Sequence, residues 1–409
     1  MDHLLSHNLL SPHQHAFISK HSTTTNLLEC IHDWTLSLQS RHSTDIIYID
    51  FSRAFDSIVF SKLLFVLQQY GITGRLLNWI ENFISYRSQC VVVKGSFSSV
   101  CEVVSGVPQG SVLGPILFLI YINDIEKVCM GSCLLKLFAD DLKLYCKITV
   151  DCPSLSLQST LNNTCEFAND RQLAINFVKC NVLSVSRTSS STPNNSVYLI
   201  NNIPIKCVPE VTDLGVTISS DLSFKAHINS IVAKARQRQG IFFRGFCSRD
   251  LELVRKAFIT YIRPILEFNS IIWNPTEIYL IDLIEKVQRN FTKNIPYLND
   301  LSYNDRLAKL KLEPLELRRL HFDLVFYYKI INHLLPIDPY NYFTIYLSPL
   351  SSRSDPTSLH RPVKATERTL ASFFYRQTPV WNGLPSHVKS LQSVASFKHA
   401  IKSLNFKQF

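Results

Sequence analysis

The sequence lacks the cysteine pairs of a zinc site. Its 11 cysteines are scattered over 409 residues without a C-x-x-C pair, and the closest two are Cys129 and Cys133. Structural zinc sites need thiolates at short, regular spacing, and small secreted domains need a disulfide framework. The scatter argues against both classes and favours an intracellular protein with buried, reduced thiols.

Long hydrophobic runs are also missing. The longest apolar stretch, residues 112–122, contains Gly114 and Pro115 and falls far short of the roughly 20 residues that span a membrane. The first residues show neither a basic nor a long apolar segment, so we expect no signal peptide and no membrane partner. Its 409 residues are enough for two or three domains, and with 46% apolar and 18% charged residues the chain can bury a sizeable core.

Charge is distributed unevenly along the chain. Residues 1–224 carry 15 Lys and Arg against 18 Asp and Glu, a net charge of −3, whereas residues 225–409 carry 27 against 14, a net charge of +13. A basic region is typical of proteins that bind a phosphate backbone, although a solvated surface can have the same composition. Charge alone favours a nucleic-acid partner only slightly.

The most informative stretch is Leu134–Tyr145, where two alternating apolar runs flank Asp140 and Asp141. Period-2 alternation predicts a β-hairpin with two carboxylates at its tip. Like charges side by side repel each other, which a multivalent cation would relieve. The plain alternative is a solvated turn, because Asp is a common turn residue.

A third acid favours the metal hypothesis. The largely β-branched run Ile46–Ile49 ends in Asp50 and leads into a turn and a helix. If this strand pairs beside the hairpin, a strand spacing of about 4.8 Å brings Asp50 next to Asp140. A cluster of three carboxylates suits two divalent cations that serve phosphoryl transfer.

The remaining pattern is mixed in the first half and helical in the second. The loop Ser105–Pro115 holds closely placed Gly and Pro residues, where backbone can approach a ligand. We expect a loop at 186–196 and a linker or extended arm at 334–365. Helices are predicted at 26–39, 61–70, 75–85, 116–122, 155–173, 225–240, 251–261, 278–294, 303–310, 315–333 and 394–404, and further strands at 90–93, 100–104, 182–185, 197–200 and 203–205.

Four motifs in this order and spacing resemble those of reverse transcriptases, most closely those of jockey-like non-LTR retrotransposons. They are Asp50-Phe51-Ser52-Arg53-Ala54-Phe55-Asp56, Ser105-Gly106-Val107-Pro108-Gln109-Gly110-Ser111, Phe138-Ala139-Asp140-Asp141 and Val211-Thr212-Asp213-Leu214-Gly215-Val216. Ser11-Pro12-His13-Gln14 and Trp381-Asn382-Gly383-Leu384-Pro385 resemble blocks before and after them. Each motif alone is modest, but the resemblance runs over most of the chain.

The resemblance implies an α+β fold, that of a right-hand polymerase with a ferredoxin-like palm, reduced fingers, a helical thumb and a helical C-terminal region. The implied domains are residual fingers at 1–45, the palm at 46–221 with an insertion at about 58–104, the thumb at 222–300, and a basic helical region at 301–409. The implied activity adds dNTPs to the 3′ end of a DNA primer on an RNA template. It would use two Mg²⁺ ions, with Mn²⁺ as the alternative metal.

The resemblance also assigns residues. Asp50, Asp140 and Asp141 would bind the metal ions. Substrate contacts would come from Phe51, Arg53, Ala54, Phe55, Gln109, Gly110 and Lys179, and the primer grip from Leu214 and Gly215. Phe55 would exclude a ribose 2′-hydroxyl, or be simply a core aromatic; Lys179 would act near the leaving pyrophosphate, or be simply solvated. Asp56 is expected to be structural, as a cap of the next helix.

The sequence departs from the family after Gln14, where the segment His15-Ala16-Phe17-Ile18 lacks the usual Gly and Arg. In the family, this segment of the fingers contacts the triphosphate, so the missing residues affect that contact. The family's upstream fingers strands and endonuclease are also absent, so we expect a truncated element. An inactive fragment that binds nucleic acid through its basic half is therefore the alternative hypothesis. A structural protein with incidental Asp-Asp turns is the third.

Overall fold

The computed structural model describes residues 1–149, 154–187, 197–246, 248, 250–345, 358–360 and 364–406. Most of the expected loop at 186–196 and part of the expected linker at 334–365 lie outside these residues. The chain forms two compact units. The sheet unit comprises Met1–Asn26 and Ser40–Val211, and the helical unit comprises Leu27–Gln39 and Thr212–Phe409.

The sheet unit is built on a five-stranded sheet of order β11-β8-β1-β7-β6. Its strands are β1 (Thr44–Ile49), β6 (Leu134–Phe138), β7 (Asp141–Lys147), β8 (Asn181–Val185) and β11 (Lys206–Cys207). Strand β1 runs antiparallel to both β7 and β8, and β6 runs antiparallel to β7. Helices separate β1 from β6 and β7 from β8, which gives the β-α-β-β-α-β topology of ferredoxin-like folds. The predicted α+β class with the ferredoxin-like palm of a right-hand polymerase is confirmed.

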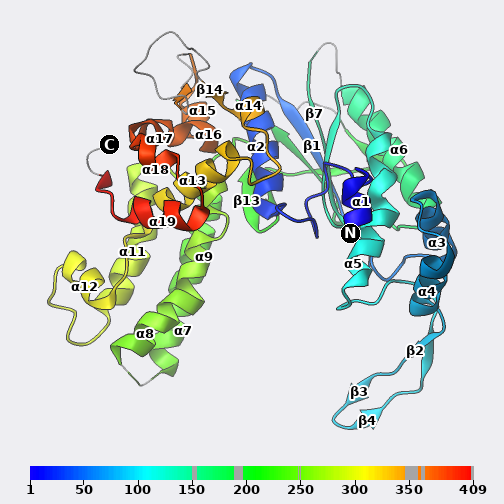
Figure 1. The fold of residues 1–409 in the computed structure, drawn as a ribbon, viewed down its shortest axis with the longest axis horizontal. Helices are drawn as coiled ribbons and strands as arrows, with labels where there is room; N and C mark the ends of the chain where they lie inside the picture. Colours follow the sequence, from blue (N-terminus) through cyan, green and yellow to red (C-terminus); the bar gives the residue numbers. More distant parts are fainter. Residues whose placement is uncertain are drawn as a thin grey trace. The chain divides into compact units, whose positions relative to one another are not determined.

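The sheet unit also contains several helices. They are α1 (Asp2–Ser6), the start of α2 (Thr23–Gln39), α3 (Phe60–Gln69), α4 (Gly74–Ile84), α5 (Leu113–Ile122), the 3₁₀ helix η1 (Asn123–Val128) and α6 (Ser154–Asp170). Helices α5 and α6 lie beside the sheet (Figure 1), and their Phe118 and Leu161 share one core with Ile47 and Leu144. Helix α5 is apolar all round, which is typical of a buried helix, and seven of its residues are buried.

The insertion between α4 and α5 carries two short ladders that extend away from the rest of this unit (Figure 1). Strand β2 (Arg87–Gln89) pairs with β5 (Cys101–Val103), and β3 (Val92–Val93) pairs with β4 (Ser96–Phe97). The sequence predicted two longer strands here. Lys94 and Gly95 both have positive φ and turn the chain between β3 and β4, so the pairing forms two short ladders. A further hairpin joins β9 (Leu199–Ile200) to β10 (Ile203–Pro204).

The helical unit contains most of α2 and a chain of helices after the hairpin of β12 (Glu210–Asp213) and β13 (Val216–Ser219). The helices are α7 (Lys225–Gly245), α8 (Leu251–Ala257), the π-helical η2 (Phe258–Ile262), α9 (Arg263–Glu267), α10 (Ser270–Trp273), α11 (Ile278–Lys293), α12 (Tyr303–Leu310), α13 (Leu315–Ile331), α14 (Pro339–Tyr342), α15 (Glu367–Ala371), α16 (Phe373–Arg376), α17 (Thr378–Gly383), α18 (Ser386–Lys389) and α19 (Val394–Lys402). Strands β14 (Thr344–Ile345) and β15 (Leu359–His360) pair with each other. The predicted helical second half is confirmed.

Helix α13 is the core of the helical unit, where it contacts α10, α11 and α19. Its Asp323 is fully buried and accepts two hydrogen bonds from Arg376, at 2.7 and 2.8 Å. A buried carboxylate needs such a partner, because an unpaired buried charge is very costly. Over the described residues, no helix combines the length and the apolar character that crossing a membrane requires.

Candidate active site

Asp50 stands where β1 leaves the sheet. Its carbonyl oxygen accepts a hydrogen bond from the Asn176 amide at 2.8 Å, and the Ser52 amide donates to the Ala174 carbonyl at 2.7 Å. A β-bridge between Phe51 and Ile175 lies between these two bonds. The backbone around Asp50 is therefore held on the β8 side, and its carboxylate remains partly exposed.

The acidic hairpin lies on the other side of Asp50. Ile49 pairs with Leu142 in the antiparallel register, so Asp50 is level with Asp141, the first residue of β7. Neighbouring strands are about 4.8 Å apart, so this register sets the distance between the two backbones. The predicted pairing of the Asp50 strand beside the acidic hairpin is thus confirmed.

The carboxylates of Asp50 and Asp140 are electrostatically coupled. Burial raises the pKa of Asp140, and the negative charge of Asp50 raises it further. A divalent cation between them would remove this repulsion, and carboxylate oxygens are the ligands that Mg²⁺ prefers. The donor set therefore fits a hard cation.

The third ligand is not assembled in this structure. Among the residues that the structure describes, no three His, Cys, Asp or Glu side chains gather closely enough to hold a metal ion. Instead, Lys179 Nζ lies 3.7 Å from Asp50 Oδ1, in an ion pair whose side chains are both partly exposed. The convergence of Asp50, Asp140 and Asp141 on metal ions stays a prediction.

The glycine-rich loop packs against the turn that follows β1. Val107 donates its amide proton to the Phe55 carbonyl at 3.0 Å, and Ser105 Oγ donates to the Asp56 carbonyl at 2.8 Å. Gly106 has a φ of +83°, and a Cβ there would come within 2.7 Å of the Asp56 backbone. Only glycine satisfies both conditions, so the close approach of the two segments depends on it.

Asp56 has a different role from the predicted one. The N-cap of α3 is Val59, so Asp56 does not cap that helix. Its Oδ1 accepts a hydrogen bond of 2.7 Å from Nε2 of Gln109 instead. The carboxylate thus orients the side chain of Gln109, which the family resemblance implies as a substrate contact.

The Phe55 ring is partly buried between aromatic neighbours. It stacks on Phe118 with ring centroids 4.2 Å apart and meets Phe17 edge-on at 6.5 Å. Of its neighbours in sequence, Ala54 is buried and Arg53 is exposed with a φ of +50°. Gly110, at the end of the loop, is exposed with a φ of +81°. The contacts of these residues with a nucleotide remain predictions.

The proposed primer-grip residues belong to the helical unit. Leu214 and Gly215 form the tip of the β12–β13 hairpin, with φ of +45° and +82°. A Cβ on Gly215 would come within 2.9 Å of the Phe268 ring. Positive φ at both central residues is the mark of a type I′ turn. Their relation to the acidic site in the sheet unit remains a prediction.

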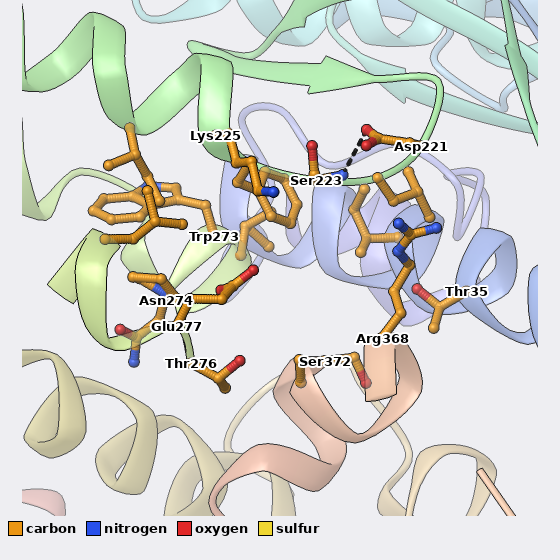
Figure 2. Close-up of a pocket in the computed structure, with 18 of the residues that line it drawn as sticks. Thr35, Asp221, Ser223, Lys225, Trp273, Asn274, Thr276, Glu277, Arg368 and Ser372 are labelled. Atoms are coloured by element: carbon orange, nitrogen blue, oxygen red, sulfur yellow. Dashed lines mark hydrogen bonds between the residues drawn. The ribbon is translucent and has the colours of Figure 1, made fainter. Parts of the chain in front are cut away.

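A cavity of about 290 Å³ lies within the helical unit. Figure 2 shows its lining, with Asp221 bonded to the Ser223 amide at one side and Glu277 and Thr276 at another. Burial opposes ionisation of Asp221, but hydrogen bonds from Ser219 and Ser223 outweigh it and lower the pKa of Asp221. The sequence analysis singled out none of these residues. Charges of both signs line the cavity, so its composition does not select one class of ligand.

The comparisons with known proteins agree with the geometry of the sheet unit. Residues 1–218 match the family described as reverse transcriptase (RNA-dependent DNA polymerase). The chain belongs to the reverse transcriptase family.

Its curated relatives come from mobile elements. The chain is 28% identical over 232 residues to the RNA-directed DNA polymerase from mobile element jockey of Drosophila funebris, which covers 55% of this chain and 25% of that protein. It is 24% identical over 268 residues to the probable RNA-directed DNA polymerase from transposon X-element of Drosophila melanogaster, which covers 64% and 29%. The chain thus spans about a quarter of the length of these relatives.

Solved structures overlap only loosely with this reverse transcriptase chain. Telomerase from Candida albicans in complex with a fragment of telomeric RNA is 11% identical, with a TM-score of 0.42, over 93% of this chain and 53% of that one. The RNA-dependent RNA polymerase of a human picobirnavirus is 12% identical, with a TM-score of 0.39, over 70% and 50%. The family assignment depends on the sequence match.

Proposed function

We propose that this chain is an RNA-directed DNA polymerase of a non-LTR retrotransposon. The observation that carries the proposal is the strand register that sets Asp50, at the end of β1, level with the acidic hairpin in the sheet of a reverse transcriptase family member. Its substrates would be deoxynucleoside triphosphates, a DNA primer and an RNA template.

The reaction brings the primer 3′ oxygen close to the negatively charged triphosphate. The primer 3′ oxygen loses its proton and forms a bond to the α-phosphorus, while the bond from that phosphorus to pyrophosphate breaks. Asp50, Asp140 and Asp141 would hold Mg²⁺ ions, which supply the positive charge that activates the hydroxyl and neutralises the leaving group. Lys179, whose ammonium group lies 3.7 Å from Asp50 Oδ1, would act near the leaving pyrophosphate.

The other residues would position the nucleotide. Asp56 holds Gln109 towards the turn after β1, and Phe118 supports the Phe55 ring from behind. A ring held by stacking cannot yield to a 2′-hydroxyl without losing that contact. This rigidity is what selection of deoxyribose over ribose requires.

Primer extension on an RNA template tests the proposal. The wild type should extend a DNA primer in Mg²⁺, and Asp140→Ala should reduce extension by about a thousandfold or more, a size typical of losing a group that stabilises the transition state. Asp2→Asn, an exposed carboxylate on α1, is the matched control and should extend normally. Equal extension by the wild type and Asp140→Ala would reject the polymerase assignment.

A second candidate is nucleic-acid binding without chemistry. It is favoured by the net charge of +13 after residue 224 and by the ion pair that Lys179 makes with Asp50. Binding of single-stranded RNA that weakens steeply with salt, survives Asp50→Ala and leads to no nucleotide incorporation would select this function.

A further inference from the structure

A buried glutamine is bound to the catalytic turn. Gln14 is 2% exposed, and its Oε1 accepts the Ala139 amide proton at 2.9 Å, while its Nε2 donates to the Ala139 carbonyl at 3.4 Å. One side chain thus bonds both the N–H and the C=O of the residue immediately before Asp140. The same Oε1 also accepts the Ala16 amide proton at 2.9 Å, so the orientation of the amide group is fixed by its partners.

Ala139 needs this support because of its backbone. Its φ is +56°, in the left-handed region that side chains with a Cβ rarely adopt. Rotation of Ala139 towards ordinary φ would swing Asp140, the next residue, away from Asp50. Ala139 is buried, with only 6% of its surface exposed, so water cannot readily replace its two hydrogen bonds with Gln14.

The backbone of Gln14 is itself fixed beside the strand that leads into the turn. The Leu137 amide donates to the His13 carbonyl at 2.9 Å, and the His15 amide donates to the Leu137 carbonyl at 3.0 Å. Gln14 and Leu137 form a parallel β-bridge between these bonds. The segment therefore adds to the edge of β6 and delivers the glutamine amide two residues further along, at the turn.

We propose that Gln14 is a positioning residue that holds Ala139 in its left-handed conformation and so fixes the carboxylate of Asp140 beside Asp50. The proposal deepens the proposed polymerase function and rests on it for its kinetic consequences. It also has a consequence that needs no activity, which is protection of the Ala139 amide proton from solvent exchange.

The matched variants separate positioning from packing. Gln14→Ala removes both hydrogen bonds between the Gln14 side chain and the Ala139 backbone. Ala139→Gly in the same chain then gives the turn a residue that adopts positive φ without a steric penalty, and should restore the geometry. Asn26→Ala is the control, because Asn26 Nδ2 donates a buried bond to the Leu137 carbonyl on the same strand but does not touch the turn.

Kinetics on an RNA template give the first readout. Gln14→Ala should lower kcat by about ten- to a hundredfold, the cost of a misplacement near 1 Å, and raise the Mg²⁺ concentration for half-maximal rate, with unchanged affinity for the primer–template duplex. Ala139→Gly should recover at least tenfold of this loss, and Asn26→Ala should stay within threefold of the wild type. A failure of rescue, or an equal loss in Asn26→Ala, would overturn the proposal in favour of a purely structural role.

Hydrogen exchange gives the second readout and needs no turnover. In Gln14→Ala the Ala139 amide should exchange at least tenfold faster, while the Leu144 amide, in the middle of β7, should be unchanged. If the wild type proves inactive, the polymerase function fails but this measurement still decides the role of Gln14. Unchanged exchange at Ala139 would overturn the positioning role whatever the activity.

Discussion

Among the residues that the structure describes, four hairpins have two-residue tips, and the tip that carries Asp140, the proposed catalytic tip, is built differently from the other three. The tips Lys94-Gly95, Asn201-Asn202 and Leu214-Gly215 have positive φ at both residues. These pairs contain Gly or Asn, which tolerate the left-handed region, so the turn is encoded where it forms. At the catalytic tip, φ is positive at Ala139 but not at Asp140.

This difference shows where each geometry originates. At the proposed primer-grip tip, Gly215 adopts its positive φ without a steric penalty, whereas Leu214 beside it does not share this freedom, and the Phe268 ring lies against Gly215. The catalytic tip has no such residue and relies on Gln14, which lies 125 positions away in the sequence. A substitution at Gln14 would therefore change the position of the Asp140 carboxylate without changing the acids themselves.

The largest effect is expected at the catalytic tip, where activity and stability should move in opposite directions. Because burial and Asp50 raise the pKa of Asp140, the folded state binds more protons than the unfolded state between the ordinary and the raised pKa. Stability in divalent-free buffer therefore falls as pH rises through that window. Asp140→Asn should abolish primer extension, raise the melting temperature at pH 7 and flatten its dependence on pH.

The control for this variant is Asp2→Asn, on the exposed surface of α1. It should leave the melting temperature and its pH dependence as in the wild type. A lower melting temperature for Asp140→Asn at pH 7 would show that the acidic tip stabilises the fold. The inference that the charge of the acidic tip lowers stability would then be wrong.

The next effect in size is expected at the primer-grip tip. Gly215→Ala places a Cβ within 2.9 Å of the Phe268 ring on a backbone with φ of +82°, so we expect a loss of about 1–3 kcal/mol in the free energy of unfolding. Urea denaturation followed by circular dichroism measures it. Phe268→Ala in the same chain should recover the part due to the clash but not the part due to φ. No recovery would mean that the ring contact carries no energy.

A smaller effect is expected at the loop that contacts Asp56. Asp56→Ala frees the Gln109 side chain from its bond of 2.7 Å and should raise KM for dNTP several-fold with a smaller change in kcat. Asp56→Asn keeps an oxygen acceptor and should behave nearly as the wild type. If Asp56→Asn is as defective as Asp56→Ala, charge rather than orientation is the contribution of this residue. Steady-state kinetics with varied dNTP concentration decides between the two.

The smallest stability effect is expected for the exposed ion pair. Lys179 and Asp50 are 66% and 36% exposed, so water and salt screen their attraction and Lys179→Gln should change the free energy of unfolding by less than about 0.5 kcal/mol. The same variant should slow nucleotide incorporation if the lysine acts on the leaving pyrophosphate. Rapid-quench measurement of a single addition tests this. Unchanged incorporation would leave Lys179 as a solvated surface residue.

Local patterns in the sequence predicted the strands and helices and located the acids. Alternation in Leu134–Tyr145 and the β-branched run before Asp50 predicted β6, β7 and β1, because strand periodicity is a local property of neighbouring side chains. The helical second half followed from the 3.6-residue period in the same way. Order and spacing of the motifs then identified the family before any contact was known.

The contacts that hold the site together became visible in the folded chain. The hydrogen bond between Gln109 and Asp56 joins residues 53 positions apart, and the hydrogen bond between Ala139 and Gln14 joins residues 125 positions apart. No local pattern reports such pairs, since each depends on how strands and loops far apart in the chain come to lie side by side. The alanine at positive φ shows this most directly, because its conformation contradicts its own preference and is stable only among these neighbours.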